Sequence, residues 1–174
     1  ALFMLALPGS AYLYQGEELG LPEVLEIPAE RRQDPTFHRT GGRSVGRDGA
    51  RVPLPWTPDG PSFGFGSGPA HLPQPTWFAG FAASSQAGVA GSTLEFYRRA
   101  LALRPHLRSD ETLEWLPAGG DDLLGFARGG GLRCFCNFGA KPAPLPPGEI
   151  LVASAPDGIV PGGRLPPNSA IWLA

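Results

Sequence analysis

The 174-residue chain is poor in cysteine, and it contains only Cys134 and Cys136. Residues two apart in a strand lie on the same face with parallel side chains, so this pair does not suit a disulfide. No histidine or cysteine lies close enough in the sequence to complete a zinc site. We therefore expect both cysteines to be small buried core residues, and we expect this chain to hold no metal ion.

Charge of either sign is also scarce, because charged residues make up 17% of the chain and the formal net charge is -2. This balance excludes strong electrostatic attraction to nucleic acid. The only early apolar run, residues 2–7, is too short to cross a bilayer, and no basic segment of a secretory signal precedes it. We therefore expect no nucleic-acid or membrane partner and a cytoplasmic protein. We also expect a chain whose first residue, Ala1, lies inside a helix of a longer protein.

Glycine and proline are abundant instead, with 25 and 21 residues, while hydrophobic residues still make up 42%. This mixture is typical of a folded protein with many loops and short strands. Residues 1–7 are predicted to end a helix, and residues 11–15 to form a buried strand after a Pro-Gly-Ser break. From residue 21 to about 74 no period is sustained, and a loop of this length is normally functional or disordered. Its aromatic and charged residues favour function.

The clearest helix is predicted to begin after Ser92. Ser92 and Glu95 have the spacing of a capping box, in which the serine hydroxyl accepts from the N3 amide and the glutamate reaches back to the N-cap amide. Apolar residues at helical spacing follow, and Pro105 ends the pattern.

Beyond the helix the period changes to that of short strands separated by Gly and Pro turns. Such a pattern is typical of an antiparallel sandwich or barrel. We divide the chain into residues 1–106 and residues 107–174. The aromatic residues within the strand pattern, Trp115, Phe126, Phe138 and Trp172, are predicted to be core. The predicted strands are Leu113–Leu116, Leu123–Arg128, Leu132–Phe138, Ile150–Ala153 and Ala170–Leu173.

Five segments in order resemble the last third of an α-glucosidase: AYLYQGEELGL, RQDPTFHRTGG, GRDGARVPLPW, TLEFYRRALALR and LPPNSAIWLA. The family is that of the α-amylase-like glycoside hydrolases (glycoside hydrolase family 13), in the branch of α-glucosidases, oligo-1,6-glucosidases and trehalose-acting enzymes. The resemblance covers nearly the whole chain. It implies an α/β plus all-β fold, in which the last βα unit of a (β/α)₈ TIM barrel precedes a small antiparallel β-sandwich. Residues 11–15 would be the eighth strand, residues 21–76 the loop after it, and residues 93–104 the eighth helix.

The resemblance also implies where the reacting groups lie. A retaining glycosidase needs two carboxyl groups roughly 5 to 5.5 Å apart. In this family a nucleophilic Asp, an acid/base Glu and a stabilising Asp come from earlier strands, the last within an Asn-His-Asp motif that this chain does not contain. All three are therefore expected upstream of Ala1. We assign no catalytic residue and no cofactor, and we expect the chain to be inactive alone.

The substrate-binding candidates are Arg47, Asp48 and Arg51. A guanidinium donates two N–H groups to vicinal sugar hydroxyls or to an orienting carboxylate. By resemblance, Arg47 would hold the glucose at subsite -1 and make the enzyme exo-acting, Arg51 would border the leaving sugar, and Asp48 would fix the loop. A solvated, salt-bridged loop is the alternative.

Gln15, Glu17 and Glu18 would line the pocket or support residues that do; a purely structural role is equally open. Glu17 and Glu18 do not suit a catalytic pair, because adjacent strand residues point to opposite faces. His38 and His71 are expected to be structural hydrogen-bonding groups. The loop aromatics could stack on sugar rings or pin the loop to the barrel. These are Trp56, Phe63, Phe65 and Trp77.

Three functions are compatible with these residues. The first is an α-glucosidase acting on malto- or isomalto-oligosaccharides. The second is a trehalose synthase or another transglycosylase on the same scaffold. The third is a non-catalytic carbohydrate-binding β module, which usually presents an exposed aromatic surface. The oligomeric state is left undetermined.

Overall fold

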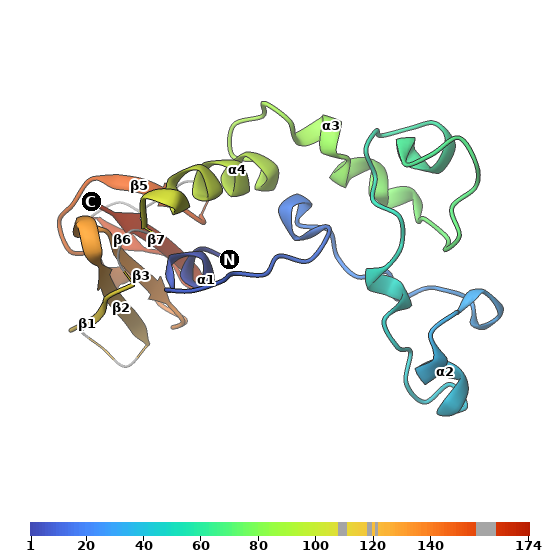
Figure 1. The fold of residues 1–174 in the computed structure, drawn as a ribbon, viewed down its shortest axis with the longest axis horizontal. Coiled ribbons are helices and arrows are strands. Elements are labelled where there is room, and N and C mark those ends of the chain that lie inside the picture. The colour runs from blue at the N-terminus through green and yellow to red at the C-terminus, as the bar shows by residue number, and fades with distance from the viewer. Residues whose placement is uncertain (108–110, 118–119, 121, 156–162) are drawn as a thin grey trace. The chain divides into compact units, whose positions relative to one another are not determined.

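The computed structural model describes residues 1–107, 111–117, 120, 122–155 and 163–174. They form two compact units, one of residues 1–12 and 96–174 and one of residues 13–95. Figure 1 shows that all the strands belong to the first unit. The boundary placed by sequence between residues 106 and 107 stays a prediction, and residues 108–110 beside it lie outside the described residues.

The first unit is built on a five-stranded antiparallel sheet with the order β1-β2-β3-β7-β5. The five predicted strands are confirmed to within one residue at each end. Two further strands, β4 and β6, pair with each other. With two residues each they are too short to produce an alternating pattern, so the sequence did not reveal them. The strands are β1 Leu113–Leu116, β2 Leu123–Arg128, β3 Arg133–Asn137, β4 Ala143–Pro144, β5 Ile150–Ala153, β6 Arg164–Leu165 and β7 Ser169–Leu173.

Both faces of the large sheet are covered. On one face Phe126, Cys134 and Trp172 pack with helix α1 (Leu2–Ala6) and with Ala100 of helix α4 (Thr93–Leu103). On the other face, apolar side chains of β2, β3 and β7 pack around Leu165 of β6. The sheet is therefore the middle layer of the unit, and the predicted antiparallel C-terminal domain is confirmed. Alternating side chains of β2, β3 and β7 supply the two cores.

Two of the four predicted core aromatics are not core. Phe126 and Trp172 are fully buried, but Trp115 is 58% exposed and Phe138 is 61% exposed. Trp115 lies on the edge strand β1, where its ring meets the ring of Phe126 edge-on. Phe138 follows the last residue of β3. The prediction failed because alternation assigns a side chain to a face, whereas burial also requires a neighbour over that part of the face.

The start of the chain follows the predicted helix. Residues 2–6 form α1, and Ala1 is its N-cap residue, with no side-chain hydrogen bond to the helix. The carbonyl oxygen of Ala1 accepts from Leu5 N at 2.9 Å, which is the first hydrogen bond of the helix. The predicted helix at residues 1–7 is therefore confirmed to within one residue at each end, and Ala1 flanks its first turn. The expectation of carboxylates upstream of Ala1 stays a prediction.

The predicted buried strand at residues 11–15 is absent. The segment makes no strand pairing within the part of the chain that the structure describes, and Tyr12 is 85% exposed. A strand is stabilised by hydrogen bonds to a neighbouring strand, so an apolar, aromatic run without such a neighbour stays irregular.

The second unit contains the predicted long loop, residues 21–76, and it is stabilised by short helical turns and a small apolar core. Val24, Ile27, Val52, Leu72 and Phe78 make this core. The elements of the unit are η1 Glu17–Leu19, η2 Ala29–Arg31, α2 Pro35–Arg39, η3 Asp48–Ala50, η4 Pro61–Gly64, η5 Thr76–Phe81 and α3 Ala83–Gln86.

The start of α4 follows the predicted cap in part. Ser92 Oγ accepts a hydrogen bond from Glu95 N at 3.2 Å, as a capping box requires. Ser92 N donates to the carbonyl oxygen of Val89, however, and Glu95 Oε1 accepts from Gly88 N at 2.8 Å. The glutamate therefore ties the preceding turn to the helix.

The remaining turns are η6 Arg104–Leu107 and η7 Gly129–Gly131.

Candidate functional site

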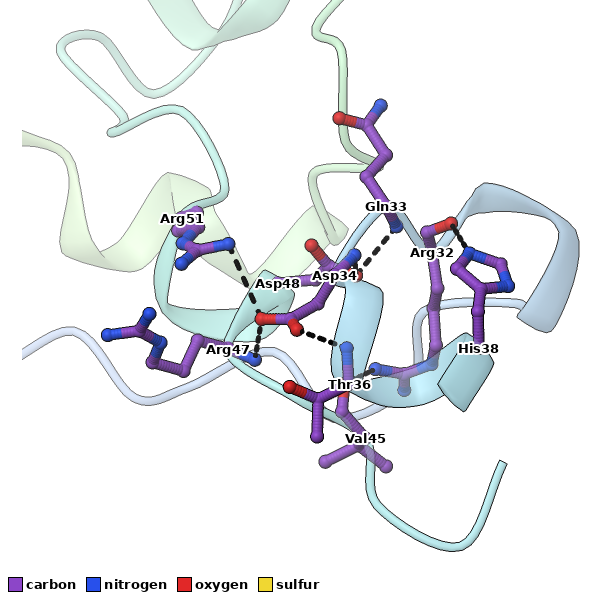
Figure 2. A network of polar contacts seen from close by, with 9 residues as sticks. All are labelled: Arg32, Gln33, Asp34, Thr36, His38, Val45, Arg47, Asp48 and Arg51. Atoms are coloured by element: carbon purple, nitrogen blue, oxygen red, sulfur yellow. Dashed lines mark hydrogen bonds and ion pairs between the residues drawn. The ribbon is translucent and has the colours of Figure 1, made fainter. Parts of the chain in front are cut away.

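Asp34 is the centre of the polar network in the second unit. It is the N-cap of α2, and its Oδ1 accepts from Thr36 N at 2.8 Å. Pro35 fits the first helical position because that position needs no N–H group. Asp34 Oδ2 accepts from Arg47 N at 2.9 Å and lies 3.4 Å from Arg51 Nη1 (Figure 2). One carboxylate therefore joins α2 to the segment that carries both candidate arginines.

A second carboxylate completes the link. Asp48 is 1% exposed, and its Oδ2 accepts from Gln33 N at 2.8 Å and from Asp34 N at 2.9 Å. The hydrogen bonds of Asp34 run toward residues 47 and 51, and those of Asp48 run back toward residues 33 and 34. The predicted role of Asp48, to fix the loop, agrees with this geometry.

The electrostatics of Asp34 follow from its hydrogen bonds. The backbone N–H of Arg47, then the N–H of Thr36, and the nearby Arg51 guanidinium lower the pKa of Asp34 to about 2. Hydrogen bonds and positive charge that favour the ionised form cause such shifts. The network is therefore organised around a carboxylate that is ionised at neutral pH.

Arg32 and His38 support the same loop from its other side. The buried Arg32 guanidinium donates to the carbonyl oxygens of Val45 at 3.1 Å and Leu25 at 2.9 Å. His38 Nε2 lies 3.1 Å from the carbonyl oxygen of Arg32. The structural role predicted for His38 is confirmed. His71 is exposed.

The two candidate arginines are held differently. Arg47 is tied down through its main chain, and within the described part of the chain its exposed guanidinium has no hydrogen bond or ion pair. Figure 2 shows that guanidinium extended away from Asp34. Arg51 is half-buried and turned toward Asp34. Arg47 thus has its donors available for a ligand, while Arg51 shares one with a carboxylate.

The candidates before the loop hold a turn. Glu17 Oε1 accepts from Tyr14 N at 3.2 Å, and Glu18 Oε2 accepts from Gly16 N at 2.9 Å. Gln15 Nε2 lies 3.5 Å from the carbonyl oxygen of Ala50. Gln15 and Glu17 also line a cavity of about 170 Å³ in this unit. The structure supports a local backbone role for both glutamates.

The loop aromatics divide into two pairs. Phe63 and Trp77 pack against the apolar core of the unit around Phe78. Trp56 and Phe65 are exposed. The first pair therefore packs within the loop's own core, and the predicted attachment of the loop to the barrel stays a prediction. The second pair is placed for contact with solvent or a ligand.

Sequence reasoning missed Asp34 and Arg32. The Asp34-Pro35 pair is a recognisable helix start, since Asp is a favoured N-cap and Pro a favoured first residue. That signal predicts a cap for α2. It does not predict the bonds to Arg47 and Arg51, which depend on the path of the loop.

Comparison with known families now adds to this geometry. The family model described as "Alpha amylase, catalytic domain" matches residues 1–111. The chain belongs to the α-amylase family. A second model, a domain of unknown function (DUF3459), matches residues 76–172, which include the antiparallel sheet. The predicted fold class, the end of the catalytic domain followed by an antiparallel domain, is confirmed.

Individual relatives agree with the family. A Rhizobium meliloti (strain 1021) protein named "Probable alpha-glucosidase" is 39% identical over 144 residues, which cover 79% of this chain and 25% of that protein. Alpha-glucosidase MAL32 of Saccharomyces cerevisiae is 29% identical over 126 residues, covering 57% of this chain and 21% of its own length. The chain thus spans about a quarter of the curated relatives it matches.

Solved structures match almost the whole chain. The alpha-glucosyl transfer enzyme XgtA is 34% identical with a TM-score of 0.74, covering 99% of this chain and 34% of its own. The trehalulose synthase MutB (mutant A258V, in complex with Tris) is 21% identical with a TM-score of 0.77, covering 99% and 37%. At 21% identity, the similarity to MutB shows a shared fold and carries no conclusion about function.

Across the described ranges, no three His, Cys, Asp or Glu side chains converge as a metal site. Among the described residues, none of the helices is long and apolar enough to span a bilayer.

Proposed function

We propose that this chain is the C-terminal part of a retaining, exo-acting α-glucosidase that removes terminal α-linked glucose from malto- or isomalto-oligosaccharides. The observation that carries the proposal is the state of Arg47: its main chain is anchored to Asp34, and its guanidinium is exposed and extended from the loop. A fixed backbone with free, forked donors suits recognition of vicinal sugar hydroxyls. The α-glucosidase name of the 39% identical relative supports the substrate class.

The division of roles follows the contacts. Arg47 binds the far hydroxyls of the terminal glucose and closes the pocket. Asp48 keeps residues 33 and 34 in place, and Arg51 borders the leaving sugar. The catalytic carboxylates lie upstream of Ala1, on earlier strands of the full-length enzyme, so the 174-residue chain by itself does not hydrolyse a chromogenic α-glucoside. Hydrolysis by the purified chain would overturn that part of the proposal.

The test is Arg47→Ala in the full-length enzyme, assayed with maltose. We expect kcat/KM to fall about 100-fold, because the lost contact is worth a few kcal/mol in the transition state. Arg43→Ala removes an exposed arginine of the same loop, whose Nε donates to the carbonyl oxygen of Thr40. That control is expected to stay within about twofold of the parent. An unchanged kcat/KM for Arg47→Ala contradicts the proposal.

A second candidate is transfer of glucose to another sugar, and the 34% identity to an alpha-glucosyl transfer enzyme favours it. Hydrolysis and transfer share the glycosyl-enzyme and differ in whether water or a sugar attacks it. Incubation of the full-length enzyme with maltose separates them: free glucose alone indicates hydrolysis, whereas new oligosaccharides or trehalose indicate transfer.

The exposed Trp115 and Phe138 favour testing the third candidate, a carbohydrate-binding β module. Titration of the 174-residue chain with maltose, followed by tryptophan fluorescence, is the direct measurement. Saturable binding that is lost in Trp115→Ala supports the module, and absence of binding removes it.

A further inference from the structure

We propose that Asp34 is a positioning residue, which holds Arg47 and Arg51 in the arrangement that binds the sugar. This inference rests on the proposed substrate-binding role of Arg47. Asp34 does not itself need to touch the sugar, because it acts through the two arginines.

The two carboxylate oxygens of Asp34 have separate tasks. Oδ1 caps α2 through Thr36 N at 2.8 Å. Oδ2 accepts from Arg47 N at 2.9 Å and contacts Arg51 Nη1 at 3.4 Å. A helix cap needs only one accepting oxygen. The second oxygen is therefore committed to the arginine pair.

The contacts of Oδ2 explain why the two guanidinium groups differ in their partners among the described residues. Arg47 is fixed through its main chain, so its side chain stays available to a ligand. Arg51 is fixed through its side chain, so its charge stays beside Asp34. One oxygen thus anchors the main chain of Arg47 and restrains the guanidinium of Arg51.

The surroundings leave Asp34 little freedom. Asp34 N donates to the buried Asp48 at 2.9 Å. A Cβ atom on Gly46 would lie 2.5 Å from Asp34 Cγ, and Gly46 has a φ of +68°. The backbone of the arginine segment therefore passes directly against the Asp34 side chain. Positioning groups of this kind work by locking the conformation of the residues that bind.

The test compares three substitutions of Asp34 in the full-length enzyme. Asp34→Asn and Asp34→Ser keep one oxygen for the cap of α2, since both residues are good N-caps. Neither keeps an additional carboxylate oxygen for the arginines. Asp34→Ala removes both functions. If Asp34 positions the arginines, all three variants lose at least about tenfold in kcat/KM on maltose. Asp34→Ala loses more thermal stability than the other two variants, because it alone also removes the cap of α2.

A merely structural cap gives a different pattern. In that case Asp34→Asn and Asp34→Ser keep the parent's kcat/KM and only Asp34→Ala is impaired, which overturns the inference. Asp59→Asn removes the same charge from an exposed position of the unit and is expected to stay within about twofold of the parent.

The triple variant Asp34→Asn with Arg47→Ala and Arg51→Ala separates this inference from the proposed function. If Asp34 acts through the two arginines, the triple variant loses no more than about twofold in kcat/KM beyond the double variant Arg47→Ala with Arg51→Ala. Additive losses contradict the positioning role while leaving the proposed function intact. An active Arg47→Ala variant overturns the proposed function and this inference together, so the two failures are distinct.

Discussion

The buried guanidinium of Arg128, on β2, donates a hydrogen bond to the carbonyl oxygen of Leu107, 3.0 Å away. It also donates to the carbonyl oxygens of Ala6, at the end of α1, and of Thr112. Carbonyl groups at the end of a helix have no partner inside the helix, and a cation there also suits the helix dipole. A single side chain of the sheet thus satisfies three main-chain segments of the first unit.

Arg128→Met is therefore expected to be strongly destabilising. It leaves buried carbonyl groups without this donor, and we expect the free energy of unfolding to fall by about 3 kcal/mol or more. Urea unfolding of the 174-residue chain measures it. Arg133→Met is the control, because Arg133 donates to the carbonyl oxygen of Ala174 at an exposed position. Its cost is expected to be under about 1 kcal/mol, and equal costs for the two variants would contradict the assignment.

Gly46→Ala tests the close approach of the loop to Asp34. Gly46 and Gly41 both have positive φ, of +68° and +60°, so alanine strains the backbone at either position. Only at Gly46 does the added Cβ collide with Asp34, since nothing lies within 4 Å of a Cβ at Gly41. In the full-length enzyme we expect Gly46→Ala to lose about tenfold or more in kcat/KM, and Gly41→Ala about twofold at most. Similar activities for the two variants would show that the contact is unimportant.

Acid is expected to weaken the loop network through Asp34. Its pKa is lowered from 3.8 to about 2 in the folded chain, chiefly by the N–H of Arg47. A depressed folded pKa gives stability that is present above the unfolded pKa and lost as the pH falls from about 4 toward 2. The stability difference between the parent and Asp34→Asn should therefore shrink between pH 6 and pH 2.5 in urea unfolding. A difference that does not change with pH would argue against the ionised carboxylate as its source.

The cysteines are expected to be inert in the folded chain. Both are free and buried, and burial raises the pKa of Cys134 to about 12 and also raises that of Cys136. The reactive thiolate is therefore scarce at pH 8. A thiol reagent should label the native chain at least about 100-fold more slowly than the chain in guanidinium. Rapid labelling of both thiols in the native chain would refute their burial.

Several features followed directly from local sequence. Alternation between Gly and Pro turns predicted the five strands of the sheet, and Ser92 predicted the start of α4. The Arg-Asp-x-x-Arg segment pointed to the loop that holds the polar network. These features depend on neighbours within a few residues, so a single sequence contains the necessary information.

Other features required distant neighbours. Residues 11–15 have the composition of a strand, but a strand forms only with a partner, and the described residues provide none. Trp115 and Phe138 alternate correctly and are nevertheless exposed, because burial depends on what covers the sheet at that point. In both cases a local pattern was overruled by the surroundings.

At the candidate site, local sequence pointed to Arg47, whereas the contacts of Asp34 depended on the tertiary structure. The sequence by itself determined the family, the sheet, the long loop and the choice of Arg47 as a candidate for sugar binding. Only the tertiary structure decided that Asp34 Oδ2 anchors the main chain of Arg47 and contacts Arg51. The physical reason is that a carboxylate selects its donors by distance and direction, and the path of the loop determines which donors come within reach.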